Sequence, residues 1–560
     1  MGRRIPHMRP RFAWSACWAV AMLLVPHLAV GADEVPLHQQ TDLHIVAKTP
    51  DFENIAAPLA ADDEFLRRIT LDLTGTLPTR EQTQQFLDDA DPDKRHKLIE
   101  QLLASPEYAR HMQQTFDVIL MRRLAAKNVS AAEWQTFLQK SFAENKPYNQ
   151  IVSEILSADG TDPKKRGPAR FYLDRNGETN AITEDIARVF LGRNLECAQC
   201  HDHPEVDDYL QSHYYGISAF LVRSYIFKDP KLKKVVFAEK AEGEVKFRSV
   251  FIETKKDNTT PPRVIDGKPF PDPDIQKADL YVVKPAKNVR PIPKYSRRDL
   301  IDEAIGSAEN RRFARTAVNR FWAMFMGRGL VHPVDFDHSA NPPSHPELLD
   351  LLTDEFITHK FDIKWLLREL TLSTTYQRSS RREPAAIAVA SEVPETAFAQ
   401  AIMKPLSPVQ MASAILQATG EADVQRKTLG DKLTEVALHK RLDRLSKIIV
   451  KLFAEPAGEL PGDFDSRVNQ VLFLSNDPTS AGLVNQRTGN LVDRAAMLPA
   501  DNPAAVADEL FLSAFSRRPT EDEAKEVEQY LTGLTDKKRI EALQELTWAF
   551  ITSAEFRFNH

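Results

Sequence analysis

The sequence predicts a mainly α-helical protein, with multi-helix N- and C-terminal domains and a small β-rich subdomain inserted near the middle. Apolar residues recur at helical spacing from Asp62, as in "DDEFLRRITLDLTGTLPTREQTQQFLDD", and again from Arg297 to the C-terminus. Between these parts, "KKVVFAEKAEGEVKFRSVFIET" alternates apolar and polar residues around Gly243, a pattern typical of two strands. The stretch that follows, "TTPPRVIDGKPFPDPD", has the prolines and glycines of turns.

The first residues predict a secretory signal peptide. Four arginines precede the apolar run "WSACWAVAMLLVPHLAV", and small residues follow at positions 30–32. An uncleaved N-terminal anchor is the alternative, although the run is short for a membrane span. We therefore expect an extracytoplasmic protein, in the periplasm, at the cell surface or secreted, with no transmembrane domain after signal cleavage.

Changes in composition place the domain boundaries. We expect a signal peptide at 1–32, a leader at 33–60, a helical domain at 61–229, the β-rich subdomain at 230–290 and a helical C-terminal domain at 291–560. A chain of 560 residues is too long for one compact domain, which agrees with this division.

The two helical parts share features at their helix ends. Thr79 with Gln82, and Thr520 with Glu523, have the spacing of a capping box. Three serines each stand three residues before an aromatic residue; these pairs are Ser105 and Tyr108, Ser373 and Tyr376, and Ser553 and Phe556. The pattern indicates either a common way to end a helix or a duplicated helical unit.

The charge of the chain argues against nucleic acid as a partner. The whole chain has a net charge of −6, and loss of the signal's arginines makes it about −10. The short basic stretches "DPKKRG" and "KLKK" are predicted to be solvated surface.

A cysteine pair dominates the chemistry of the mature chain. Cys17 lies in the predicted signal, which leaves only Cys197 and Cys200, in "CAQCH". On a helix, these two thiols and the imidazole of His201 share one face. The preceding run "TEDIARVFLGRN" is predicted to be a helix capped by Thr183.

Four interpretations of this motif are open. The first is covalent attachment of one haem c per chain, with Cys197 and Cys200 bonded to the porphyrin and His201 ligating the iron. The second is a zinc or other metal site that also uses His203. A redox-active disulfide and a plain disulfide are the third and fourth. Export favours the haem, since haem is attached outside the cytoplasm.

Other residues are candidates for ligands. Five residues whose side chains can ligate a metal lie in the loop 332–345: His332, Asp335, Asp337, His338 and His345. Asp and His are also common turn residues. Ser344 with Glu347 predicts a capping box for the next helix. A sixth haem ligand could come from a methionine or a distant histidine, but methionines in apolar helices are more often core residues; the candidates are Met112, Met121, Met324, Met326 and His213.

Several stretches resemble a known pair of domains. "DLTGTLPTREQTQQFL", "LLASPEYARHM", "NKPYNQIVSEILSADG" and "CAQCHDHPEVDDYLQSHYYGISAFL" are similar to the planctomycete cytochrome-like domain, domain of unknown function 1549. "VNRFWAMFMGRGLVHPVDFD" and "NPPSHPELLDLLTDEFITHKFDIKWLLRELTLSTTYQRSS" resemble its companion, domain of unknown function 1553. The resemblance implies that Cys197 and Cys200 hold a haem and that His201 is its proximal ligand. Glu205 departs from the family pattern, which has an aromatic residue after "CHDHP".

The sequence thus predicts an exported redox protein with a c-type haem, performing electron transfer or a haem-dependent oxidation. Its redox partner is unknown and could be another exported cytochrome. One alternative is a helical scaffold or partner-binding protein whose C-x-x-C-H turn is held by a metal ion or a disulfide. Another is an extracellular hydrolase whose site has no recognisable motif.

Overall fold

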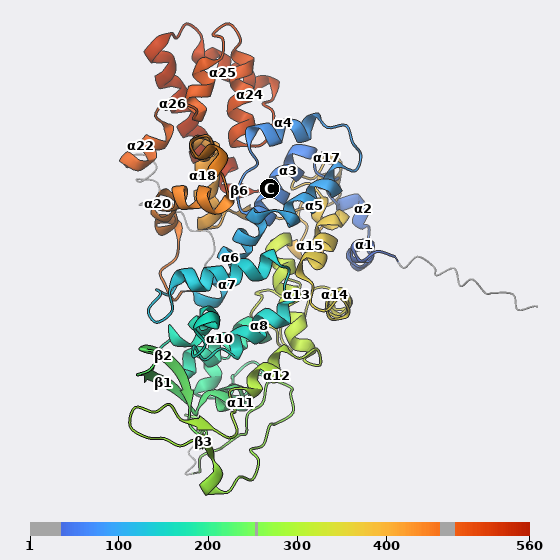
Figure 1. Cartoon of the computed structure of the whole chain (residues 1–560). Coiled ribbons are helices and arrows are strands. Elements are labelled where there is room, and N and C mark those ends of the chain that lie inside the picture. Colours follow the sequence, from blue (N-terminus) through green and yellow to red (C-terminus); the bar gives the residue numbers. More distant parts are fainter. Residues whose placement is uncertain (1–34, 252–255, 460–476) are drawn as a thin grey trace, which may run out of the picture. The chain divides into compact units, whose positions relative to one another are not determined.

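The computed structural model describes residues 35–251, 256–459 and 477–560 (Figure 1). The predicted signal peptide lies outside these ranges. Helices dominate the described residues, and the strands form only two-stranded sheets, which confirms the predicted fold class. Within the same ranges, no helix has the length and apolar character needed to cross a membrane.

The segment predicted to be a leader is folded. It forms helices α1 (Leu37–Lys48) and α2 (Phe52–Ile55), and the side chains of Leu37 and Ile45 are buried. The Asp42 carboxylate accepts hydrogen bonds from the backbone N–H groups of Thr374 and Thr375, each at 2.8 Å. This segment is therefore part of the core rather than a loose leader.

A first set of helices builds most of the larger hydrophobic cluster. Its members are α3 (Asp62–Thr74), α4 (Arg80–Asp88), α5 (Lys94–Ala104), α6 (Pro106–Met121), α7 (Ala131–Ala143), α8 (Tyr148–Leu156), α9 (Arg170–Leu173), α10 (Thr179–Leu191) and α11 (Gln211–Leu221). The 3₁₀ turns η1 (Pro163–Lys165), η2 (Gly167–Ala169) and η3 (Cys197–Gln199) connect them. The capping box of Thr79 and Gln82 is present. The predicted Thr183 cap is wrong, because α10 begins one turn earlier and the Thr183 hydroxyl donates to the Thr179 carbonyl inside the helix.

The β-rich part contains two small sheets. β1 (Ser224–Asp229) pairs antiparallel with β2 (Lys234–Glu239), and β3 (Tyr281–Val283) pairs with β4 (Ile292–Pro293). The predicted partner strand after Gly243 forms only an isolated bridge between Phe247 and Asn258. The partner of β2 precedes it instead, because the Asp229 carboxylate accepts from the N–H groups of Lys231 and Leu232 and so closes a tight hairpin turn.

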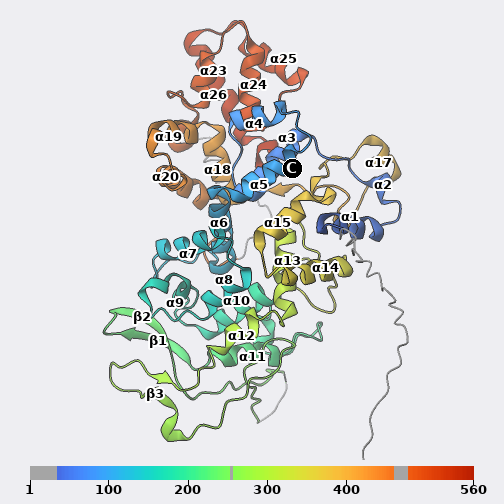
Figure 2. The same ribbon diagram turned by 45° about the vertical axis from the view of Figure 1, so that its right-hand side comes forward.

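The second half of the chain is helical again. Its helices are α12 (Leu300–Gly306), α13 (Arg311–Met326), α14 (Pro346–Thr358), α15 (Ile363–Leu372), α16 (Thr374–Gln377), α17 (Pro384–Val389), α18 (Pro408–Ala418), α19 (Glu421–Leu429), α20 (Glu435–Phe453), α22 (Pro478–Val484), α23 (Leu491–Met497), α24 (Pro503–Ala514), α25 (Glu521–Leu531), α26 (Asp536–Thr552) and α27 (Ala554–Arg557). α13 contacts α14, α15 and α10. Residues of α18, α20 and the helices from α22 to α27 make up most of the second hydrophobic cluster; Figure 2 shows the ribbons of α18 to α20 and of α23 to α26.

The three repeated serines have one role. Ser105, Ser373 and Ser553 each end one helix and cap the next by accepting a hydrogen bond from the N–H of the aromatic residue three positions on. All three aromatic side chains are buried. The pattern is a junction between two helices; duplication of a larger unit stays a prediction.

A buried polar cluster joins distant segments of the chain. The Asp72 carboxylate of α3 accepts from the Tyr376 hydroxyl at 2.9 Å, the Lys404 ammonium at 2.6 Å and the Asn559 amide at 2.7 Å. Lys404 and Asn559 also lie on the short strands β5 (Lys404–Pro405) and β6 (Phe558–Asn559), which pair with each other. The two hydrophobic clusters meet along α3, because Ile69 and Leu73 belong to the first cluster and Leu71 belongs to the second.

Candidate functional site

The C-x-x-C-H turn (residues 197–201) is one turn of helix. The N–H groups of Cys200 and His201 both donate to the Cys197 carbonyl, at 3.2 and 3.4 Å. The two thiols are exposed and not bonded to each other. Ala198 is buried and packs the inner side of the turn against the core. The predicted arrangement, with both thiols and the imidazole on one turn, is the one the chain adopts.

Neighbouring side chains hold this turn in place. The Gln199 carbonyl accepts from the Tyr215 hydroxyl at 2.9 Å and from the Gln211 amide at 3.4 Å, both on α11. On the other side, the Cys200 carbonyl accepts from the Val250 N–H at 3.0 Å. The Tyr215 ring also stacks on the Phe247 ring, with their centroids 4.4 Å apart. The backbone between the thiols is thus fixed while the thiols themselves face solvent.

The imidazole of His201 is oriented for ligation through Nε2. Its Nδ1 lies 2.7 Å from the Asp202 carbonyl oxygen, so Nδ1 carries the proton in this contact and Nε2 keeps its lone pair. The Phe251 ring packs against the imidazole, with centroids 4.7 Å apart. The Asp202 carboxylate accepts from the Gln211 N–H at 2.7 Å, which fixes the residue that holds the ring.

His203 faces a different set of residues. Its Nδ1 accepts from the Glu205 N–H at 3.2 Å, and its ring lies edge-on to the Tyr209 ring. The Tyr209 ring also contacts the ring of His338, with their centroids 5.1 Å apart. No three His, Cys, Asp or Glu side chains of the described ranges are placed to hold a metal ion together. The geometry therefore gives the zinc interpretation no support.

The His–Asp loop (residues 332–345) packs directly against the segment before the C-x-x-C-H turn. The Asn194 N–H donates to the Asp335 carbonyl at 2.8 Å, and the Asp337 N–H donates to the Gly192 carbonyl at 2.9 Å. Arg193 joins the two segments, because its guanidinium donates to the Asp208 carboxylate at 2.7 Å and to the Asp337 carbonyl at 2.9 Å. Sequence reasoning did not single out Arg193, since nothing local marks a contact 144 positions away.

The carboxylates of the His–Asp loop are paired with arginines. Asp335 lies 2.6 Å from Arg320 and 3.3 Å from Arg188, and Asp337 lies 3.3 Å from both Arg312 and Arg315. Guanidinium partners leave these oxygens little capacity for a metal ion. The structure thus does not bring the five candidate residues of this loop together as a ligand set.

His345 is separated from the other members of that set. It is buried, its Nδ1 lies 3.1 Å from the Ser344 hydroxyl, and burial, reinforced by Lys48 and His44, lowers its pKa to about 4. The predicted capping box of Ser344 is wrong: His345 occupies the N-cap position of α14, and its side chain makes no cap hydrogen bond. Pro346 as the first helical residue moves the start of the helix by one position.

A buried ionic network supports α10, the helix that leads into the turn. The Asp185 carboxylate lies 2.6 Å from Arg122, 2.5 Å from Arg175 and 2.9 Å from Arg188. Burial alone would raise the pKa of Asp185, but the three guanidinium groups outweigh it and lower that pKa. Arg188 then continues to Asp335, so the network reaches from α10 to the His–Asp loop.

The candidates for a sixth haem ligand lie in or against the hydrophobic core, or contact another group of the protein. Met112, Met121 and Met326 are buried in the hydrophobic core, and the Met121 sulfur accepts from Arg175 at 3.4 Å. Met324 packs against the same core. His213 has its Nδ1 3.0 Å from the Asp208 carbonyl, and burial, followed by the charge of Arg193, lowers its pKa. A sixth ligand from this set therefore stays a prediction.

Fold and site together define a mainly helical protein with an exposed C-x-x-C-H turn, whose preceding segment packs against the loop of a second helical region. Two family models match the chain: a protein of unknown function (DUF1549) at residues 40–225, and a protein of unknown function (DUF1553) at 296–447. The chain thus contains both regions, in the order that the sequence resemblance predicts. Neither the curated proteins nor the solved structures gave a match. The contacts of Arg193 with Asp337 join the two family regions.

Proposed function

We propose that this protein is an exported redox protein that carries one covalently bound haem c, attached at Cys197 and Cys200 and ligated by His201. The observation that carries the proposal is the C-x-x-C-H turn itself. It presents two exposed, unbonded thiols beside an imidazole whose Nδ1 is held by the Asp202 carbonyl. A histidine held at Nδ1 is oriented to ligate iron through Nε2.

The chain's own residues have distinct tasks in this proposal. Cys197 and Cys200 would hold the porphyrin through two thioether bonds, each made by adding S–H across a vinyl double bond, so attachment would need no oxidant. Asp202 fixes the tautomer and the plane of the imidazole. Tyr215 and Gln211 hold the backbone between the two thiols. When bound, the haem supplies one-electron transfer or oxidation chemistry at its iron.

Export belongs to the same proposal. The predicted signal peptide at residues 1–32 would deliver the chain to the extracytoplasmic space, where its redox partner, such as another exported cytochrome, would be met. Thiols that are exposed and unbonded in an oxidising compartment react unless a cofactor occupies them.

The test is to produce the protein in a host that attaches haem and to record its absorption spectrum and its denatured mass. We expect a haem absorption band and a mass increase of one haem. The Cys197→Ala/Cys200→Ala variant must lose both, while Cys17→Ala, which removes the third cysteine, must keep both. Haem retained by the double variant contradicts the proposal. Stoichiometric zinc without a chromophore would instead favour the scaffold interpretation, and catalytic hydrolysis that survives the double substitution would favour the hydrolase.

A further inference from the structure

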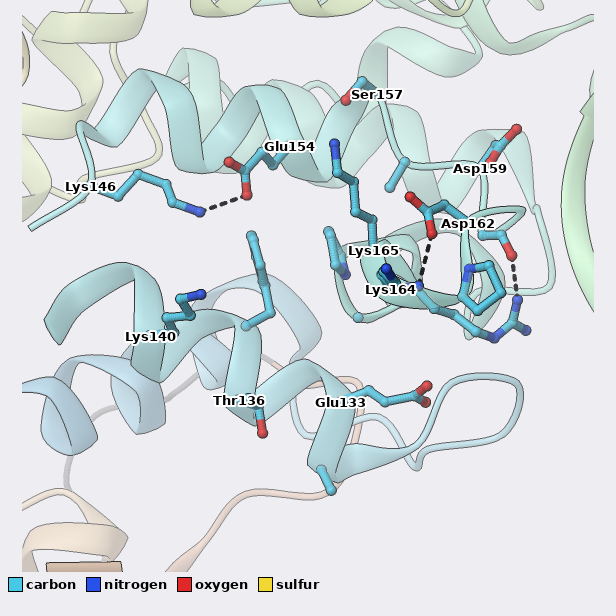
Figure 3. Close-up of a pocket in the computed structure, with 18 of the residues that line it drawn as sticks. Glu133, Thr136, Lys140, Lys146, Glu154, Ser157, Asp159, Asp162, Lys164 and Lys165 are labelled. Carbon is cyan, nitrogen blue, oxygen red and sulfur yellow. Dashed lines mark hydrogen bonds and ion pairs between the residues drawn. The ribbon is translucent and has the colours of Figure 1, made fainter. Parts of the chain in front are cut away.

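A second site lies in the first helical region, away from the C-x-x-C-H turn. α7, α8 and the loop from Ser157 to Pro168 surround a cavity of about 750 Å³ (Figure 3). Small-molecule sites in proteins commonly have volumes of about 300–1,000 Å³. The size of this cavity therefore fits a metabolite rather than a few water molecules.

The wall formed by the loop is rigid. Arg166 of "DPKKRG" is buried, although the sequence predicted solvated surface there, and its guanidinium donates to three carbonyls. These are Gly160 at 2.6 Å, Asn128 at 3.0 Å and Val235 at 2.8 Å. At Gly167, a Cβ atom would lie 2.6 Å from the Glu133 carbonyl, so the loop approaches α7 as closely as glycine allows. The cavity is preformed, which lowers the entropy cost of binding.

The acidic side chains around the cavity are already engaged within the protein. Three of them form ion pairs: Asp159 with Arg290 at 3.0 Å, Glu154 with Lys146 at 2.7 Å and Glu144 with Lys140 at 3.8 Å. The other two accept hydrogen bonds: Asp162 from the Lys164 N–H at 2.8 Å and Glu133 from the Ser130 hydroxyl at 2.7 Å. Arg166 donates hydrogen bonds to carbonyls, and the nearby carboxylates of Glu133 and Asp174 balance part of its charge.

Two ammonium groups on the same cavity have no such partner. Lys164 and Lys165 are exposed, and in the described ranges neither forms an ion pair with an acid. Figure 3 shows the Lys165 side chain extending from the loop toward α8, across the space between the two helices. Lys164 and Lys165 are therefore the cations that a ligand in this cavity can bind without breaking an ion pair.

We propose that this cavity binds a small organic anion, whose carboxylate or phosphate oxygens are held by Lys164 and Lys165. Lysine is a flexible point charge that binds such oxygens by charge-assisted hydrogen bonds. The cavity also contains the ring of Phe137 and the methyl group of Ala158, which can contact the apolar part of the same ligand. The site is independent of haem attachment.

The experiment is calorimetric titration of the purified protein with citrate and, separately, with inorganic phosphate at low ionic strength. We expect at least one of them to bind, and tighter binding of citrate or of phosphate identifies the preferred group. The Lys164→Gln/Lys165→Gln variant should weaken that binding by at least about tenfold, since it removes two charged hydrogen bonds. Added salt should weaken it as well.

The matched control is Lys537→Gln/Lys538→Gln. These lysines form a similar Asp-Lys-Lys-Arg sequence at the start of α26, exposed and outside the lining of the cavity. The control must bind as the parent protein does, and all three proteins must unfold at the same temperature without ligand. The proposal is overturned if neither anion binds, if the loop variant binds as tightly as the parent, or if neutral glucose binds as well as the anions.

Discussion

Two segments of this protein contain residue types that can bind metals, yet their surroundings differ. In the C-x-x-C-H turn the thiols are exposed, and the Nε2 of His201 makes no hydrogen bond among the described residues. In the His–Asp loop the carboxylates of Asp335 and Asp337 are taken by arginines. The comparison teaches that the type of a residue shows only whether its side chain could bind a metal or a cofactor. Whether a carboxylate is available for such binding depends on whether a neighbouring cation already pairs with it.

The largest effect is expected from removing one of the paired carboxylates. Asp335→Ala leaves the guanidinium groups of Arg188 and Arg320 with less compensation and should lower the free energy of unfolding by about 3 kcal/mol. Urea denaturation measures this free energy, and repeating it with a chelator tests whether a bound metal contributes to it. If Asp335 is purely an ion-pair partner, the chelator leaves the parent's stability unchanged.

An exposed ion pair supplies the control for that substitution. Asp443 pairs with Lys447 on the surface of α20, and Asp443→Ala should change the free energy of unfolding by less than about 0.5 kcal/mol. A chelator that destabilises the parent as much as the Asp335 substitution does would mean that the loop binds a metal after all.

The second prediction addresses the link between the two loops. Arg193→Lys cannot keep all the hydrogen bonds to Asp208 and Asp337, so it should destabilise the protein by about 2–3 kcal/mol. Amide hydrogen exchange should accelerate in residues 194–203 and 335–339 together. Faster exchange in only one of the two segments would show that Arg193 does not couple them.

The third prediction concerns pH. The pKa of His345 is about 4 in the folded protein, below its ordinary value of 6.5, so the unfolded chain binds a proton first as the pH falls from 6.5 toward 4. This group should therefore remove about 2 kcal/mol of stability between pH 8 and pH 5. His345→Leu should flatten that part of the stability curve, measured by urea denaturation at each pH. An unchanged slope would mean that His345 binds its proton over the same pH range in the folded and the unfolded chain.

The smallest effect is expected at the turn itself. Tyr215→Phe removes the hydrogen bond to the Gln199 carbonyl and should cost about 1 kcal/mol, with faster amide exchange around Cys200. The thiols should stay exposed, since Val250 still holds the turn from the other side. Titration with a thiol reagent checks this: loss of reactivity would show that the turn had collapsed.

Local signals in the sequence predicted the local structure well. The capping boxes at Thr79 and Thr520 depend on residues three positions apart, and both are present. The predicted caps at Thr183 and Ser344 do not form, because an earlier helix start and a proline decide those ends. The helix at 37–48 was not predicted, since its stability comes from packing on segments more than 300 positions away.

The candidate site shows the same division. Its thiols and imidazole follow from five consecutive residues, and the structure places them on one turn. What holds and encloses that turn could not be predicted, because Arg193, Tyr215 and Val250 act on partners distant in sequence. Such contacts leave no periodic pattern, and only the folded chain brings them together.

The amide of Asn559 reaches Asp72, a contact that spans 487 positions of the chain. Helix α3 is therefore synthesised long before the three residues that donate to its carboxylate, Tyr376, Lys404 and Asn559. During that interval the nascent chain exposes both the Asp72 carboxylate and the apolar side chains of α3, which are buried in the folded protein. A contact of such long range delays completion of the native state, so the early helices would have to be kept from aggregating until Asn559 has been synthesised.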